Sequence, residues 1–155
     1  MRSRIRDEIK QTRPFRSVEE EAALSIVRTA ATLEHTFAQA LKPYAITPTQ
    51  YNVLRILRGA GADGLCRNEV GQRLLRQVPD VTRLLDRMED LDLIARQRGG
   101  KDRRYVTTTI SKKGLELLKR LDEKVDEIHQ DQLGHLDGAR LQQLIKLLDT
   151  ARHRS

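Results

Sequence analysis

The chain has 155 residues, a length typical of one domain with its own core, and 33% of them are charged. Its formal net charge of +7 at pH 7 favours a polyanionic partner, nucleic acid first and an anionic membrane surface second. No apolar run approaches the roughly 20 residues of a membrane span, and residues 1–10 lack the apolar core of a signal peptide. The single cysteine, Cys66, forms no internal disulfide, which agrees with a reducing compartment. We therefore expect a cytoplasmic protein.

The N-terminal third predicts a basic arm followed by a long helix. Residues 1–16 carry six Lys or Arg against two carboxylates and few apolar residues, a pattern typical of a partly ordered arm. Ser17 and Glu20 have the spacing of a capping box, and apolar residues then recur at helical spacing as far as Pro43.

A second helix start follows at once. Thr47 can cap it, Pro48 suits the first helical position, and Gln50 can reach back to the cap. This helix is expected to run to about Arg58 and to end at the glycine-rich residues 59–64.

Residues 67–75 and 79–91 predict two short helices separated by a brief turn. In the second, one apolar stripe contains Val81, Leu84, Leu85, Met88 and Leu91. The opposite face contains Thr82, Arg83, Asp86 and Arg87. We therefore expect one face to pack and the other to remain free to contact a partner.

Residues 93–98 and 103–110 are short and β-prone, and Gly99, Gly100, Lys101 and Asp102 join them in a hairpin pattern. Two short helices followed by a hairpin form the layout of a winged helix-turn-helix.

The C-terminal part returns to helix. Ser111 can cap a long helix, Gly134 interrupts it, and Asp137 can cap a last one. The first of these helices has the spacing of a helix that meets another helix, at Leu118, Leu121, Val125 and Ile128; the last keeps an apolar face at Leu144, Ile145 and Leu148. These stripes exceed what the small central unit can cover, so we expect a helix-mediated homodimer.

Residues 46–114, with "ITPTQYNVLRILR" and "VTRLLDRMEDLDLIARQRGGKDRRYVTTTISKKG", resemble the MarR family of bacterial transcription regulators. The most specific piece is Asp-x-Arg at Asp102 and Arg104, followed by a strand and a helix start with Lys113 and Gly114. The helical flanks extend the resemblance over nearly the whole chain from about residue 17.

The resemblance implies a mainly α fold with a small β-hairpin wing (α+β). It divides a single domain, residues 1–155, into a basic arm at 1–16, dimerisation helices at 17–45 and 111–155, and a winged helix-turn-helix at 46–110. It also implies a homodimer that binds a pseudo-palindromic operator in double-stranded DNA, usually as a repressor that a small-molecule effector releases.

Arg can read guanine in the major groove, Thr can bond a base or meet a thymine methyl, and cations at a hairpin tip gain affinity by releasing counterions from DNA. By the resemblance, Arg104 enters the minor groove and Asp102 orients the wing. The full set of expected DNA contacts is Arg67, Asn68, Pro79, Thr82, Arg83, Arg87, Arg98, Lys101, Arg103 and Arg104.

Several alternatives stay open. Arg67 and Asn68 are either phosphate anchors or a solvated helix start. Asp80 either accepts from cytosine or, as we favour, stabilises the helix N-terminus. Asp86 and Arg87 can pair with each other or with neighbours. Asp92 stands where the family usually has Gly, which predicts slight backbone strain.

The resemblance places an effector near His35, Tyr44 and Tyr51, although such residues are more often ordinary packing residues. Cys66 lies outside the first helix, where peroxide-sensing relatives carry their reactive cysteine. The spacing of His129, His135 and His153 matches no metal site, so we expect neither metal nor cofactor.

The sequence has no nucleophile and base constellation and no phosphate loop, so we expect no enzyme. A non-specific architectural DNA binder or a basic adaptor also fits the charge, but neither explains the Asp-x-Arg wing.

Overall fold

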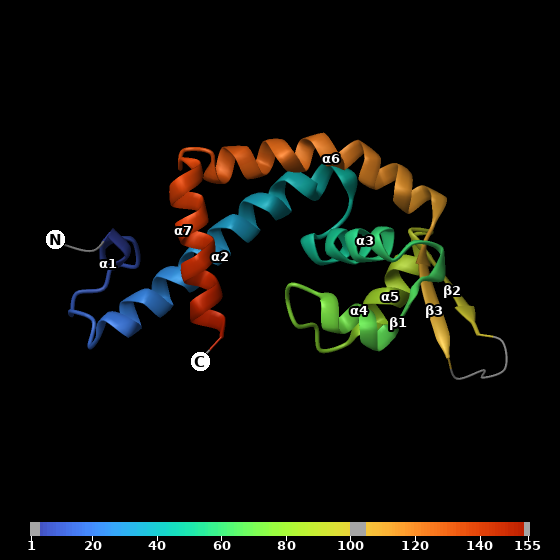
Figure 1. Cartoon of the computed structure of the whole chain (residues 1–155), viewed down its shortest axis with the longest axis horizontal. Helices are drawn as coiled ribbons and strands as arrows, with labels where there is room; N and C mark the ends of the chain where they lie inside the picture. The colour runs from blue at the N-terminus through green and yellow to red at the C-terminus, as the bar shows by residue number, and fades with distance from the viewer. Residues whose placement is uncertain (1–3, 100–104, 154–155) are drawn as a thin grey trace. The chain divides into compact units, whose positions relative to one another are not determined.

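The computed structural model describes residues 4–99 and 105–153, and this part of the chain contains the α-helices α1 to α7 and the β-strands β1 to β3 (Figure 1). The chain divides into two units, the first ending at Ala40 and the second beginning at Leu41. None of the helices in the described ranges combines the length and the apolar character that crossing a lipid bilayer requires.

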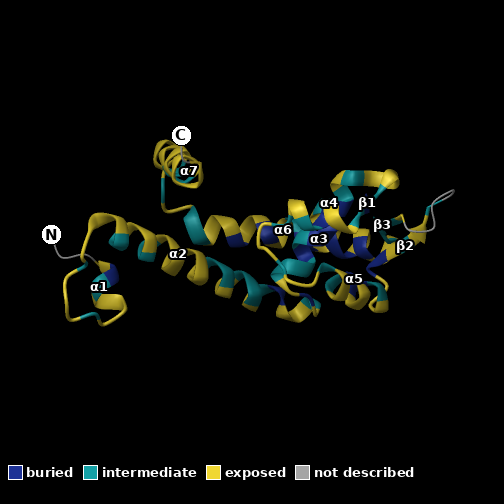
Figure 2. Cartoon of the chain, turned by 90° about the horizontal axis from the view of Figure 1, so that it is seen from below, coloured by how far each residue is buried: buried dark blue, intermediate teal, exposed yellow. Residues whose placement is uncertain are grey.

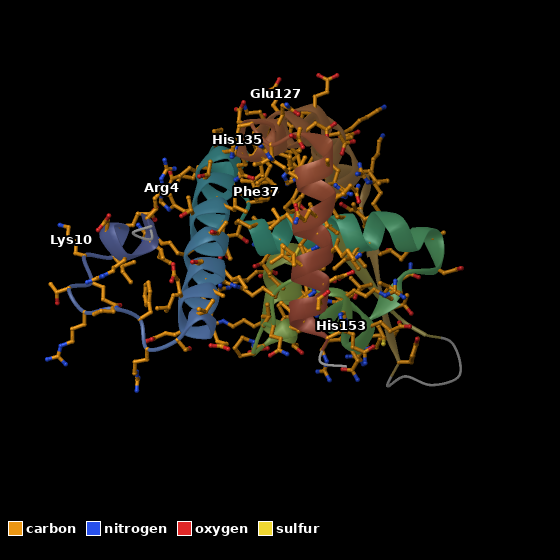
Figure 3. The ribbon with its side chains drawn as sticks, turned by 60° about the vertical axis from the view of Figure 1, so that its left-hand side comes forward. Arg4, Lys10, Phe37, Glu127, His135 and His153 are labelled. Carbon is orange, nitrogen blue, oxygen red and sulfur yellow. The ribbon has the colours of Figure 1, made fainter. Side chains whose placement is uncertain are left out.

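The first unit contains α1 (Arg4–Glu8) and α2 (Val18–Leu41), the latter ending at the unit boundary. The predicted cap is present, because the Ser17 hydroxyl accepts from the backbone N–H of Glu20 at 3.1 Å. In the basic arm, the Arg6 guanidinium donates to the backbone carbonyls of Gln11 and Thr12. The side chains of Arg4 and Lys10 mark this segment in Figure 3.

The second unit begins with a short 3₁₀ turn (Lys42–Tyr44) and continues into α3 (Pro48–Ala60). The capping box predicted at its start is confirmed: the Thr47 hydroxyl accepts from the N–H of Gln50 at 3.1 Å, and the Gln50 side chain accepts from the N–H of Thr47 at 3.0 Å. Both ends of the box satisfy backbone donors that the first turn leaves free.

A three-stranded antiparallel sheet has the order β1-β3-β2, with bounds Leu65–Cys66 for β1, Ile94–Arg98 for β2 and Val106–Ile110 for β3. The predicted hairpin is confirmed as the pair of β2 and β3. Strand β1 was not predicted, and it pairs Leu65 with Thr108 on β3. Gly64 precedes it with a left-handed φ of 64°, which favours glycine, and an added Cβ would overlap the carbonyl oxygen of Thr108.

Two helices of the helix-turn-helix follow β1, namely α4 (Arg67–Arg73) and α5 (Val81–Asp90). The predicted start of the second helix at residue 79 is two residues early. Asp80, with φ of −132° and ψ of 84°, lies outside the helical conformation and caps the helix, since its carboxylate accepts from the N–H of Arg83 at 2.9 Å. Pro79 therefore precedes the helix.

Helices α6 (Lys112–Leu133) and α7 (Gly138–Arg152) complete the chain, and both predicted caps are confirmed. Ser111 accepts from the N–H of Gly114 at 3.0 Å, and Asp137 accepts from the N–H of Arg140 at 2.9 Å. The stripe of α6 that contains Leu121 is buried within a single chain, whereas α7 has no buried residue (Figure 2).

The start of α6 packs closely on the rest of the second unit. A Cβ added to Gly114 would overlap the carbonyl oxygen of Leu93, so this approach requires glycine. Further along, Arg58 on α3 binds Asp122 on α6 through two hydrogen bonds of 3.0 Å. The hydrogen bonds from Arg58 hold the pKa of Asp122 below its ordinary value.

Candidate nucleic-acid interface

Helix α5 has the two-faced character that its sequence predicts. Leu85 and Met88 on its apolar stripe are buried, while Thr82, Arg83 and Arg87 on its other face are exposed. The buried stripe anchors the helix to the core, so the polar face is free to approach a partner.

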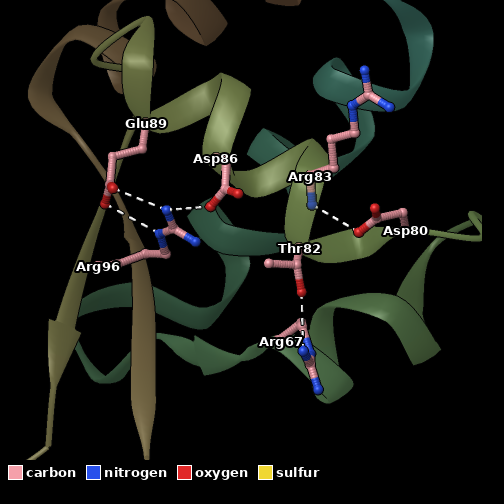
Figure 4. A network of polar contacts seen from close by, with 7 residues as sticks. All are labelled: Arg67, Asp80, Thr82, Arg83, Asp86, Glu89 and Arg96. Carbon is pink, nitrogen blue, oxygen red and sulfur yellow. Dashed lines mark hydrogen bonds and ion pairs between the residues drawn. The ribbon is translucent and has the colours of Figure 1, made fainter.

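At the start of α5, the carboxylate of Asp80 is bonded to the helix backbone at Arg83. This is the second of the two alternatives for Asp80, a stabiliser of the helix N-terminus. The guanidinium of Arg83 extends away from Asp80 and away from Thr82 (Figure 4). Arg83 forms no ion pair with another residue within the described ranges.

Arg67 and Thr82, from different helices, are brought together. Nη1 of Arg67 donates to the Thr82 hydroxyl at 2.9 Å (Figure 4). Asn68 is exposed beside Arg67. The start of α4 is thereby tied to the start of α5 by a hydrogen bond between exposed side chains.

The starts of the two helices and the turn between them line a cavity of about 690 Å³. Four of the residues expected to contact DNA line this cavity, namely Arg67, Asn68, Pro79 and Thr82. The structure therefore gathers the sequence-predicted contacts at the N-terminal ends of the helix-turn-helix into one surface.

Arg96 on β2 forms a contact that the sequence did not reveal. Its Nε and Nη2 donate to the Glu89 carboxylate at 3.2 and 2.9 Å, and Nη2 lies 2.6 Å from an oxygen of Asp86 (Figure 4). The hydrogen bonds to Glu89, and then to Asp86, raise the pKa of Arg96, and Arg96 lowers the pKa of Glu89.

Arg96 thus neutralises carboxylates of α5 and is not a freely available cation of the wing. The contact also decides between the partners considered for Asp86, which pairs with Arg96 rather than with Arg87. The signal in the sequence was the spacing of Asp86 and Glu89, which places two carboxylates on one side of a helix.

Of the DNA contacts predicted in the wing, Arg98 lies in the described part of the chain. Arg98, the last residue of β2, is exposed, and the N–H of Gly99 donates to the carbonyl of Tyr105 at 2.7 Å. The remaining wing residues of the prediction lie outside the described residues: Lys101, Asp102, Arg103 and Arg104.

The residues considered for an effector fall in both units. Tyr51 is buried and its hydroxyl accepts from Nη1 of Arg55 at 3.1 Å, and Tyr44 is half-buried in the turn before α3. His35 is an exposed residue of the first unit.

Potential metal ligands are dispersed in the described residues, where no group of three or more His, Cys, Asp or Glu side chains could hold an ion. His135 and His153 lie at opposite ends of α7 (Figure 3). Cys66 precedes α4, and its backbone N–H donates to the Glu69 carboxylate at 2.8 Å, which lowers the pKa of Glu69.

The MarR family model matches residues 46–104, which include the helix-turn-helix and β2. A curated relative, the uncharacterized HTH-type transcriptional regulator YkoM of Bacillus subtilis (strain 168), is 30% identical over 112 residues. The match spans 69% of this chain and 71% of the relative.

Solved structures extend the similarity to the flanking helices. The MarR transcription factor from Planctomyces limnophilus is 36% identical, with a TM-score of 0.68 over 88% of this chain and 98% of that chain. S. aureus MepR in its complex with DNA has a TM-score of 0.76 at 24% identity, over 83% and 94% of the two chains. The latter similarity is one of fold.

Proposed function

The chain belongs to the MarR family of transcription regulators, which bind DNA, and from this premise we propose that it represses transcription as a homodimer on a pseudo-palindromic operator. A small-molecule effector releases it. The observation that carries the proposal is α5, a helix with a buried apolar stripe and an exposed polar face that begins beside the cationic Arg67.

Helix α5 is the recognition helix in this proposal. A helix fits the major groove, where its first residues contact base edges. Thr82 and Arg83 occupy that end of α5, and Arg87 lies one turn further along the exposed side. Asn68 and Pro79 border the same cavity and approach the DNA backbone.

The wing supplies the second contact. Arg98 leads into it as an exposed cation. The family resemblance assigns the minor groove to Arg104 and the orientation of the wing to Asp102, and the cations Lys101 and Arg103 add affinity by releasing counterions from DNA. A narrow A·T-rich minor groove concentrates negative potential and therefore favours an inserted arginine.

The homodimer is supported by α7. The apolar face that contains Leu144, Ile145 and Leu148 remains at least partly exposed in the single chain, with Ile145 at 55%. Apolar helix faces of this kind are stabilised by burial against a second subunit, and two subunits place two recognition helices on successive half-sites.

Tyr44 and Tyr51 are the proposed effector contacts in the second unit, and His35 is the proposed candidate in the first. The bond between the Tyr51 hydroxyl and Arg55 joins a polar group to a cation at the edge of the core, an arrangement that suits an anionic or hydrogen-bonding small molecule.

The decisive experiment uses the DNA upstream of the gene, because such regulators often bind their own promoter. We expect a footprint over a two-fold symmetric element and a preference for it over random DNA that persists as salt reduces electrostatic affinity. Arg104→Ala is expected to weaken binding at least about tenfold while the oligomeric state is unchanged. Equal affinity for every duplex would instead indicate an architectural DNA binder.

A further inference from the structure

Arg67 and Thr82 are linked across the helix-turn-helix, although they are far apart in sequence. Arg67 is the first residue of α4 and Thr82 the second of α5, and the two side chains share a hydrogen bond of 2.9 Å. Both side chains are exposed, and Figure 4 shows Arg67 on the opposite side of Thr82 from Arg83. The guanidinium therefore stands within one hydrogen bond of the end of α5 that meets the bases in the proposed complex.

The hydrogen bond determines what this pair offers to DNA. A guanidinium has five N–H donors, so four remain after the bond to Thr82. The Thr82 oxygen accepts from Arg67, and its own O–H hydrogen must therefore point elsewhere and is available as a donor. Together the two side chains present hydrogen-bond donors to an approaching base.

The surroundings leave this donor character intact. The cavity beside the pair is lined by Asp80, but that carboxylate accepts from the backbone N–H of Arg83. Asn68 and Pro79, which also line the cavity, carry no charge. Arg67 is thus the cation among the residues that line this cavity. Its free N–H donors suit a base edge that carries acceptors.

We propose that Arg67 and Thr82 act as one base-reading unit that selects guanine at one position of each half-site. Guanine presents two acceptors, O6 and N7, in the major groove, whereas cytosine presents the N4 donor. The inference rests on the proposed function and deepens it, because Arg67 becomes a specificity-determining residue and not a phosphate anchor.

The two roles of Arg67 differ in measurable ways. A phosphate contact lowers affinity on every sequence when it is removed, and it reduces the slope of log affinity against log salt by about one. A base contact changes the preference at one position. Lys keeps the charge that a phosphate needs but lacks the planar fork that reads guanine bidentately.

The test measures binding of the full-length protein to its selected operator and to operators substituted at each position, across a range of salt. Wild type should prefer guanine at one position by at least about tenfold. Arg67→Lys should lose that preference and keep the salt slope. Thr82→Val, which removes only the hydroxyl, should weaken the preference at the same position, and Arg67→Lys with Thr82→Val should weaken it no further than Arg67→Lys alone.

Arg73→Ala is the matched control, because it removes an exposed cation at the other end of α4, outside the cavity, and should leave base preference unchanged. If Arg67→Lys binds every operator as wild type does, or if Thr82→Val changes a different position, the inference is overturned while the proposed function stands. If wild type itself has no base preference, both are overturned.

Discussion

Asp92 occupies the corner between α5 and β2 with a left-handed backbone, φ = 58°. Its N–H donates to the carbonyl of Glu89 at 2.8 Å and its carbonyl accepts from the Ser111 hydroxyl, so neighbouring groups hold this conformation. The Cβ of an L-residue is crowded in this region and glycine has no such cost. The left-handed φ of Asp92 thus accounts for the backbone strain that the sequence predicts at this corner.

Asp92→Gly should raise the free energy of unfolding by about 0.5 kcal/mol, because relief of the left-handed strain exceeds the entropy that glycine adds to the unfolded chain. Urea denaturation at pH 7 measures the change. Asp92→Ala keeps the Cβ and should be no more stable than wild type. A glycine variant less stable than wild type would contradict this account.

Among the elements, α5 and β2 are joined by Arg96. The side chain of Arg96 is 22% exposed, and its guanidinium pairs with two carboxylates of α5. The contact therefore links α5 to β2, the first strand of the wing.

Arg96→Met should destabilise the protein by about 1 kcal/mol, a value kept small because Asp86 and Glu89 are more than one-third exposed. It should also weaken DNA binding, since two uncompensated carboxylates would face the phosphates. Arg98→Met is the control for charge on the same strand: it should weaken binding without loss of stability. Equal stability of the Arg96→Met variant and wild type in urea would disprove the coupling.

The contact between Arg58 and Asp122 joins α3 to α6 and makes stability depend on pH. Arg58 lowers the pKa of folded Asp122, whereas the unfolded carboxyl titrates at about 3.9. The stabilisation is thus fully present above about pH 4 and is lost as pH falls through the lower pKa of the folded state. Asp122→Asn should cost up to about 1 kcal/mol at pH 7 and progressively less below pH 4.

Thermal unfolding between pH 7 and pH 2.5 checks this dependence. Asp126→Asn, which removes an exposed carboxylate from the same helix, is the matched control and should change stability little at pH 7. If Asp122→Asn retained its full deficit at the lowest pH, the ion pair would not be the cause.

Elements whose signals are local could be predicted from the sequence. A cap and its partner lie three residues apart, as for Thr47 with Gln50, for Ser111 with Gly114 and for Asp137 with Arg140. The apolar stripe of α5 is likewise a property of ten consecutive residues. These signals were sufficient to predict the winged helix-turn-helix layout.

Contacts between distant residues could not be predicted in this way. Leu65 and Cys66 form a strand because β3 lies beside them, and two residues carry too little β-pattern to indicate it. The partners of Arg67 and Arg96 are also set by packing, so the sequence does not show which hydroxyl or carboxylate each meets.

At the scale of the whole molecule, the apolar faces of α6 and α7, both predicted for dimerisation, differ in how far they are buried within one chain. Leu121 on α6 is fully buried within one chain, so Leu121→Asp would unfold the protomer and says little about the subunit contact. Helix α7 is different, since none of its residues is buried. The proposed interface is therefore best tested on α7.

Ile145→Glu should weaken self-association by about 2 kcal/mol, some 30-fold in the dimer Kd, because it places a charge at the centre of the apolar face formed with Leu141, Leu144 and Leu148. Sedimentation over a concentration series measures this, and because Ile145 is 55% exposed the protomer should keep its thermal stability at low concentration. Gln143→Glu adds the same charge on the opposite face of α7 and should leave the dimer intact. Dimers of equal strength in both variants would exclude this face of α7 from the interface, and a monomeric wild type would exclude the homodimer itself.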